Sequence, residues 1–206
     1  GCQIYNSATM TLEEVLDVMF AAEEEKKMTV RLHTGDPCLY GAIREQMDVL
    51  DEKKIEYDYT PGVSSFCGAA SALNLEYTLP EISQSVIITR MAGRTPVPEK
   101  ESIESFAAHH ATMVVFLSTG LLEELSRRLI DGGYSADTPA AIVYKATWED
   151  EKSFVCTVGT LAETAKKNNI TKTALMIIGD VVNCSHYDRS KLYDPGFTTE
   201  FREASK

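Results

Sequence analysis

The chain has 206 residues, of which 44% are hydrophobic and 25% are charged, a balance typical of a soluble globular protein with one large or two small domains. Its formal net charge of −11 argues against binding to nucleic acid or to anionic lipid, because both need a basic surface. Five cysteines without a CxxC pair, no signal peptide and no apolar run of about 18 residues predict reduced thiols, no membrane span and a cytoplasmic protein.

The first half of the chain reads as alternating strands and helices. Apolar residues predict short strands at residues 3–5, 29–32 and 55–59. Helices are expected from Thr11, which opens a capping box with Glu14, then over residues 39–53 and 65–73. Such a run of strand–helix units favours a parallel sheet whose functional loops follow the carboxyl ends of the strands.

The pattern changes after a linker at residues 74–82. Strands are predicted at residues 85–90, 112–117, 140–144, 153–157 and 174–178, and helices at 103–108, 121–130 and 161–167. The short gap between the third and fourth strands indicates an antiparallel pair. We therefore expect an α/β protein with two domains: an incomplete, mainly parallel first domain over residues 1–80, and a second domain over residues 81–206 with a mixed sheet and a polar tail.

Two glycine-containing turns are candidates for ligand binding. In HTGDPCLYG, Gly35 permits a close approach or a conformation that a Cβ would block, and Asp36 could cap a helix or hold a ligand hydroxyl. In TPGVSSF, Ser64 and Ser65 offer hydroxyls and amides at a helix start. Taken alone, each turn is better explained as a helix N-cap than as a ligand site.

Other kinds of site find little support. The sequence has no G-x-S-x-G motif, no phosphate-binding glycine loop and no zinc-ligand spacing. The pair His109–His110 is interpreted as a surface turn, and no metal is expected. One stretch, TRMAGRTPVPEK, is basic in an otherwise acidic chain: it contains Arg90, Arg94 and Lys100, which suit a substrate rich in carboxylates, although a solvated loop would look the same.

The order of the motifs is more specific than any one of them. HTGDPCLYG, TPGVSSF, TRMAGRTPVP, FLST, KATWEDE, KTALMIIG and SKLYDPGF follow one another over nearly the whole chain. In this order they resemble the tetrapyrrole methylases, and GRTPVPE with KATWEDE resembles the branch that methylates carbon 11 of cobalt-precorrin-4. The resemblance implies two α/β domains with S-adenosylmethionine bound in a cleft, a tetrapyrrole substrate and a homodimer.

Carried over by motif, the resemblance implies nine cofactor-binding residues: Thr34, Gly35, Asp36, Leu39, Ser65, Phe66, Leu117, Ala146 and Ala174. Arg90, Arg94 and Lys100 would bind the substrate. The family also has an N-terminal strand and a Gly-Pro-Gly-Asp-Pro loop that this sequence lacks, so we expect a shortened first domain.

The expected reaction needs no protein nucleophile, because a sulfonium is already a good leaving group, and the sequence identifies no general base. Three other interpretations stay open. They are a methylase acting on uroporphyrinogen or another precorrin, a non-catalytic cofactor-binding form, and, less well supported, a generic nucleotide-binding protein.

Overall fold

A computed structural model describes residues 1–205 and divides the chain into two compact units, the first over residues 1–64 and the second beginning at Ser65. From the sequence we predicted the domain boundary between residues 80 and 81. The difference arises because α3 (Ser65–Leu73) packs its apolar face, including Phe66 and Ala69, on the sheet of the second unit.

The first unit contains η1 (Ser7–Thr9), α1 (Leu12–Glu24) and α2 (Arg44–Glu52). The predicted capping box of α1 is confirmed: the Glu14 amide donates to Thr11 Oγ1 at 3.3 Å, and the Thr11 amide donates to Glu14 Oε2 at 2.7 Å. The helix predicted from residue 39 begins only at Arg44, because Tyr40 and Ala42 have positive φ values of 58° and 49°, which an α-helix cannot include.

The strands predicted at residues 3–5, 29–32 and 55–59 are not formed; all of residues 1–64 are described, and none of them lies in a strand. Most apolar side chains of these segments face solvent, with Ile4 89%, Val30 69% and Leu32 81% exposed. A strand needs a neighbouring strand with which to form hydrogen bonds, and an apolar sequence pattern forms no strand where that partner is missing.

The second unit is built on one five-stranded sheet with the order β1-β2-β5-β3-β4. The strands are β1 (Val86–Arg90), β2 (Thr112–Phe116), β3 (Pro139–Tyr144), β4 (Lys152–Thr157) and β5 (Ala174–Ile178). The β1–β2 pair is parallel, and the pairs β2–β5, β5–β3 and β3–β4 are antiparallel. The α/β class, the mixed sheet and the antiparallel β3–β4 pair are thus confirmed.

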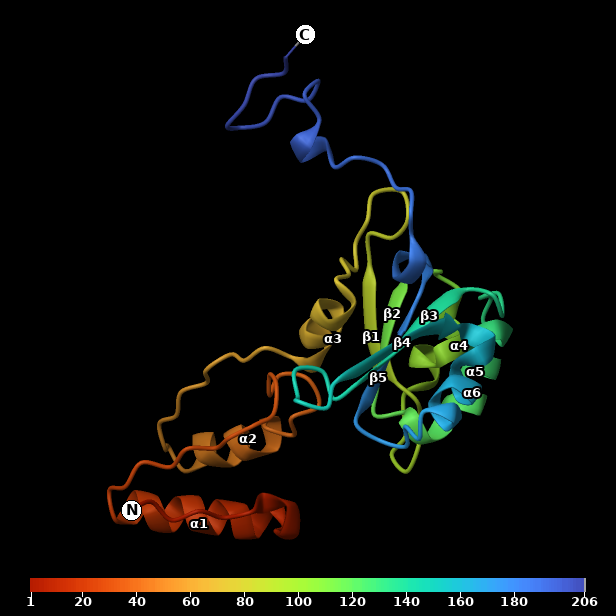
Figure 1. The fold of residues 1–206 in the computed structure, drawn as a ribbon. Helices are drawn as coiled ribbons and strands as arrows, with labels where there is room; N and C mark the ends of the chain where they lie inside the picture. The colour runs from red at the N-terminus through yellow and green to blue at the C-terminus, as the bar shows by residue number, and fades with distance from the viewer. Residues whose placement is uncertain (206) are drawn as a thin grey trace. The chain divides into compact units, whose positions relative to one another are not determined.

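Helices cover both faces of this sheet (Figure 1). Met113 and Val115 of β2 pack with α4 (Ile103–Ala107), α5 (Leu122–Asp131) and α6 (Leu161–Lys167). Val114 and Phe116 point to the other face, toward α3. Because both faces are covered, β2 and β5 are buried along their whole length, which explains why every residue of the two strands except Thr112 is apolar.

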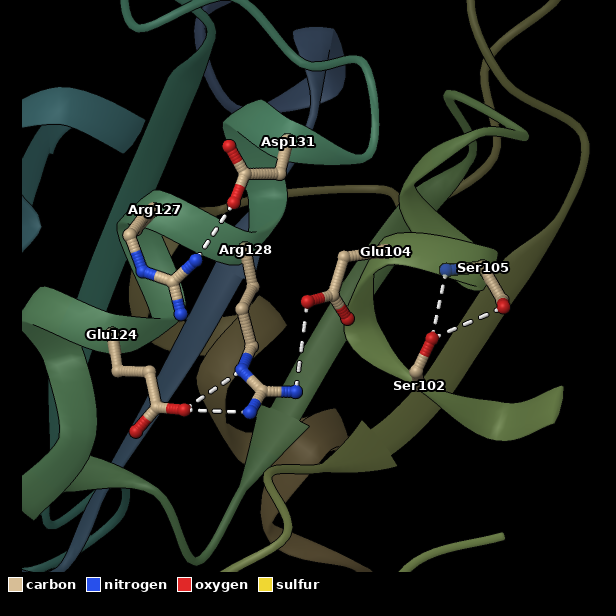
Figure 2. Close-up of polar contacts among 7 residues, drawn as sticks. All are labelled: Ser102, Glu104, Ser105, Glu124, Arg127, Arg128 and Asp131. Atoms are coloured by element: carbon tan, nitrogen blue, oxygen red, sulfur yellow. Dashed lines mark hydrogen bonds and ion pairs between the residues drawn. The ribbon is translucent and has the colours of Figure 1, made fainter. Parts of the chain in front are cut away.

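An arginine connects two of these helices at their exposed side (Figure 2). Arg128 of α5 donates through Nε to Glu124 at 2.8 Å and lies 3.6 Å from Glu104 of α4. Gly132 ends α5 where a Cβ would lie 2.6 Å from the Glu104 carbonyl oxygen. The helices α4 and α5 are therefore closely packed, and Arg128 forms ion pairs within α5 and between the two helices.

Candidate functional site

The HTGDP turn and the TPG turn meet in the first unit. The Gly62 amide donates to Asp36 Oδ2 at 2.9 Å, and a Cβ on Gly62 would lie only 2.4 Å from the Gly35 carbonyl oxygen. Gly35 has φ 76°, which favours glycine. The structure thus brings Gly35 and Asp36 into contact with a residue, Gly62, that the sequence analysis did not select, although Pro-Gly turns are a general sign of close backbone approach.

The Asp36 carboxylate is engaged by three donors. Oδ1 accepts from the Tyr59 hydroxyl and from the Cys38 amide at 2.8 Å, and Oδ2 accepts from Gly62. These hydrogen bonds, the one from Tyr59 foremost, hold the pKa of the Asp36 carboxyl well below its usual range, while the same bond and burial raise the pKa of Tyr59 to about 12. Asp36 therefore stays ionised, and its side chain organises the two turns; it does not cap α2, which begins eight positions later at Arg44.

The second unit gathers several predicted residues at one edge of its sheet. Strands β1, β2 and β3 end at this edge and β5 begins there, as the pairings Arg90 with Phe116 and Tyr144 with Ala174 show. Leu117 follows β2, Ala146 follows β3, and Ala174 opens β5. The topology thus places four predicted residues at the same end of the strands: Arg90, Leu117, Ala146 and Ala174.

The backbone at this edge is unusual. Leu117, Lys145, Thr147 and Thr173 all have positive φ, with values of 53°, 47°, 72° and 58°. Such conformations are costly for residues with a Cβ and cluster at functional sites in many proteins. Leu117 is also 72% exposed, so an apolar side chain is presented to solvent at the strand end.

Ser118 determines how this edge is held. Its hydroxyl is fully buried, accepts from the Met91 amide at 2.8 Å and donates to the Phe116 carbonyl at 2.6 Å. It therefore joins the end of β1 to the end of β2 beside Leu117. A polar residue directly after an apolar strand was the available sequence signal for Ser118.

Helix α3 packs beside the loop that follows β3. A Cβ on Gly68 would lie 3.3 Å from Ala146 Cβ and 3.2 Å from Thr147 Cγ2. Phe66 and Ala146 accordingly belong to one apolar cluster. The predicted residues of α3 and of the β3–β4 loop are thus neighbours, with Ser65 exposed at the start of the helix.

The KATWEDE loop folds largely on itself. Lys145 Nζ forms an ion pair with Asp150 at 2.5 Å and lies 5.2 Å from the centre of the Trp148 ring. Thr147 donates its amide to the Glu151 carboxylate. Ala146 is held between these contacts, half-buried.

The three basic residues differ in what they contact. The Arg90 guanidinium donates to the carbonyl oxygens of Met91 at 3.2 Å, Thr95 at 3.3 Å and Pro96 at 2.8 Å, and thereby shapes its own loop. Arg94 and Lys100 are exposed. Arg94 is therefore the better placed of the two arginines to meet a ligand.

The His109–His110 pair follows α4 (Ile103–Ala107). His110 has φ 50° and lies edge-on to Tyr134, which fits a turn. Within residues 1–205, no three His, Cys, Asp or Glu side chains are grouped to hold a metal ion. None of the helices in the same range is long and apolar enough to cross a membrane.

Comparison with known proteins identifies the family. The model of the Tetrapyrrole (Corrin/Porphyrin) Methylases matches residues 2–162. The chain belongs to the tetrapyrrole methylases. It is 50% identical, over all 206 residues and 80% of the relative's length, to the cobalt-precorrin-4 C(11)-methyltransferase of Methanocaldococcus jannaschii.

Solved structures of tetrapyrrole methylases agree with this assignment. The X-ray structure of a cobalt-precorrin-4 methyltransferase, described as a cobalamin biosynthetic enzyme, matches with a TM-score of 0.87 and 42% identity over 89% of this chain and 77% of that one. The uroporphyrin-III C-methyltransferase of Thermus thermophilus, complexed with S-adenyl homocysteine, matches with a TM-score of 0.69 and 23% identity over 82% of this chain and 74% of that one. The second match shows a shared fold only.

Proposed function

We propose that this tetrapyrrole methylase uses S-adenosylmethionine to methylate carbon 11 of precorrin-4, in its cobalt-containing form, as a step of cobalamin biosynthesis. The observation that carries the proposal is the 50% identity, over the whole chain, to a relative named for this reaction. The solved structure of the same named activity supports it at 42% identity, whereas the uroporphyrinogen-III C-methyltransferase of Bacillus subtilis is 31% identical over 179 residues.

The residues present fit the cofactor. Thr34, Gly35 and Ser65 are exposed, and Leu117 exposes 72% of its surface, so main-chain groups and an apolar side chain are available for an adenosine group. The same role extends to Asp36, Leu39, Phe66, Ala146 and Ala174. Ala174 is 8% exposed and its carbonyl already accepts from Thr119 Oγ1 at 3.3 Å, so it would contribute a packing surface.

When bound, S-adenosylmethionine supplies an electrophilic methyl group on sulfur. The chain's own residues hold the reactants in line and exclude water, which can contribute roughly 7–11 kcal/mol to catalysis in favourable cases. No general base is assigned. The protein is proposed to work in the cytoplasm as a homodimer.

The exposed Arg94 and Lys100, with Arg90 behind them in the loop, are proposed to bind substrate carboxylates. Changing Arg94→Ala should raise the KM for the tetrapyrrole and leave the affinity for S-adenosylhomocysteine unchanged, because Arg94 would meet only the substrate. Steady-state kinetics checks this, with Arg127→Ala as the control, since Arg127 is paired with Asp131 on α5. Equal KM values for Arg94→Ala and the parent chain would contradict the role of Arg94.

The function is tested by binding and by product analysis. S-adenosylhomocysteine at about 100 times its Kd should add about 2.7 kcal/mol of stability and raise the Tm by about 5–11 °C. Incubation with cobalt-precorrin-4 and S-adenosylmethionine should then give a product heavier by one methyl group, located at carbon 11 by NMR. Methylation of uroporphyrinogen instead would favour the related activity, and binding without any turnover would favour a non-catalytic form.

A further inference from the structure

Two turns of the first unit are joined by a single side chain. Gly62 donates its amide to Asp36 Oδ2 at 2.9 Å, and its Cα lies so close to Gly35 that an added Cβ would be 2.4 Å from the Gly35 carbonyl oxygen. The contact therefore depends on both glycine at position 62 and the orientation of the Asp36 carboxylate.

The orientation of that carboxylate is controlled from its other oxygen. Oδ1 accepts from the Cys38 amide at 2.8 Å and from the hydroxyl of Tyr59, which lies 23 positions along the chain. The second torsion of an aspartate is broad, so a single donor on Oδ1 leaves the carboxylate plane loosely defined. A second donor from a different segment fixes the plane and directs Oδ2 at Gly62.

We propose that Tyr59 is a positioning residue for the cofactor: its hydroxyl orients Asp36, and Asp36 holds the TPG turn against Gly35. This proposal rests on the proposed function, because the turn containing Gly35 is one of those assigned to S-adenosylmethionine. Tyr59 is 43% exposed, so its ring contributes little to any core, and the hydroxyl is the part of the side chain that joins the two segments.

The first test examines the unliganded chain and is independent of any cofactor. Hydrogen–deuterium exchange of the peptide covering residues 60–64 is measured in the parent chain, in Tyr59→Phe and in Tyr57→Phe. Tyr57 is a matched control, since it lies on the same segment, is 40% exposed and contacts Asp51 instead of Asp36. Tyr59→Phe should accelerate exchange about fivefold to tenfold, the effect of one hydrogen bond to a charged group in a partly exposed setting.

The second test measures cofactor use. Calorimetry should show that Tyr59→Phe weakens S-adenosylhomocysteine binding about fivefold to tenfold, with Tyr57→Phe within about twofold of the parent chain. The KM for S-adenosylmethionine should rise by the same factor while kcat at saturation changes by less than about twofold, because Tyr59 orients a binding turn and touches no reacting atom. Asp36→Asn should resemble Tyr59→Phe, since both Asp36 oxygens accept backbone amides and the side-chain nitrogen of asparagine can accept neither hydrogen bond.

Each result decides something. Unchanged exchange in Tyr59→Phe overturns the proposal, whatever the cofactor does. Accelerated exchange with unchanged S-adenosylhomocysteine affinity also overturns it, because the hydrogen bonds would then hold the turns without positioning the cofactor. If exchange is faster in Tyr59→Phe but the parent chain itself binds no S-adenosylhomocysteine, the proposed function is refuted instead.

Discussion

The substitution Gly62→Ala gives the sharpest test of how closely the two turns must approach. The new Cβ would lie 2.4 Å from the Gly35 carbonyl oxygen, a backbone atom that cannot rotate away, whereas ordinary contact begins at 3.4 Å. The turns must therefore separate by about 1 Å. A separation of that size stretches the 2.9 Å bond from Gly62 to Asp36 beyond hydrogen-bonding range.

Two magnitudes follow from this displacement. Overpacking of this kind costs about 1–3 kcal/mol in the free energy of unfolding. A misplacement of about 1 Å in a site that orients reactants can lower kcat/KM about 10²-fold. Gly62 has no positive φ, so the effect should come from the steric contact and not from backbone strain.

The assay is kcat/KM for methyl transfer, together with urea denaturation of the same preparations. Gly120→Ala is the control, because a Cβ there has nothing within 4 Å. We expect Gly120→Ala to keep its activity and Gly62→Ala to lose most of it. If Gly62→Ala retained the kcat/KM of the parent chain, the contact between the turns would have no bearing on catalysis.

Three further predictions concern stability. Ser118→Ala should lower the free energy of unfolding by about 1–3 kcal/mol, because the buried Met91 amide loses its acceptor; urea denaturation beside exposed Ser71→Ala checks this, and equal losses would contradict it. Leu117→Asn should raise the same free energy by up to about 1 kcal/mol, since Asn tolerates the φ of 53° better than Leu; a fall would mean that the Leu117 side chain packs. The pKa of Tyr59 is raised from 10.0 to about 12, so the contribution of its hydroxyl to the free energy of unfolding is complete below pH 10 and is lost as the pH rises to 12. The difference in this free energy between the parent chain and Tyr59→Phe should therefore shrink from pH 10 to pH 12. A constant difference would refute the prediction.

Much of the second unit could be predicted from sequence alone. The helix over residues 161–167 and the strand over residues 174–178 were predicted with the bounds that the structure shows. The antiparallel pairing of β3 with β4 was predicted from the short connection between them. These features depend on local periodicity, caps and turn length, which neighbouring residues encode. The strand order β1-β2-β5-β3-β4 depends on contacts between distant segments, and the sequence analysis did not predict it.

The first unit shows the opposite case. The segment at residues 29–32 has the composition of a strand, but pairing requires a neighbour in space, and composition cannot supply one. The helix predicted at residue 39 was displaced to Arg44 by left-handed residues that no apolar period reveals.

For the site, the order of motifs was enough to select the family, and it supplied the residues that are proposed to bind the ligands. Only the tertiary structure decided how those residues are used. The Asp36 carboxylate is occupied by Tyr59, Cys38 and Gly62, and the Arg90 guanidinium by three carbonyl oxygens of its own loop. A motif records which side chain is present, whereas its role depends on the donors and acceptors that the fold brings within about 3 Å of it.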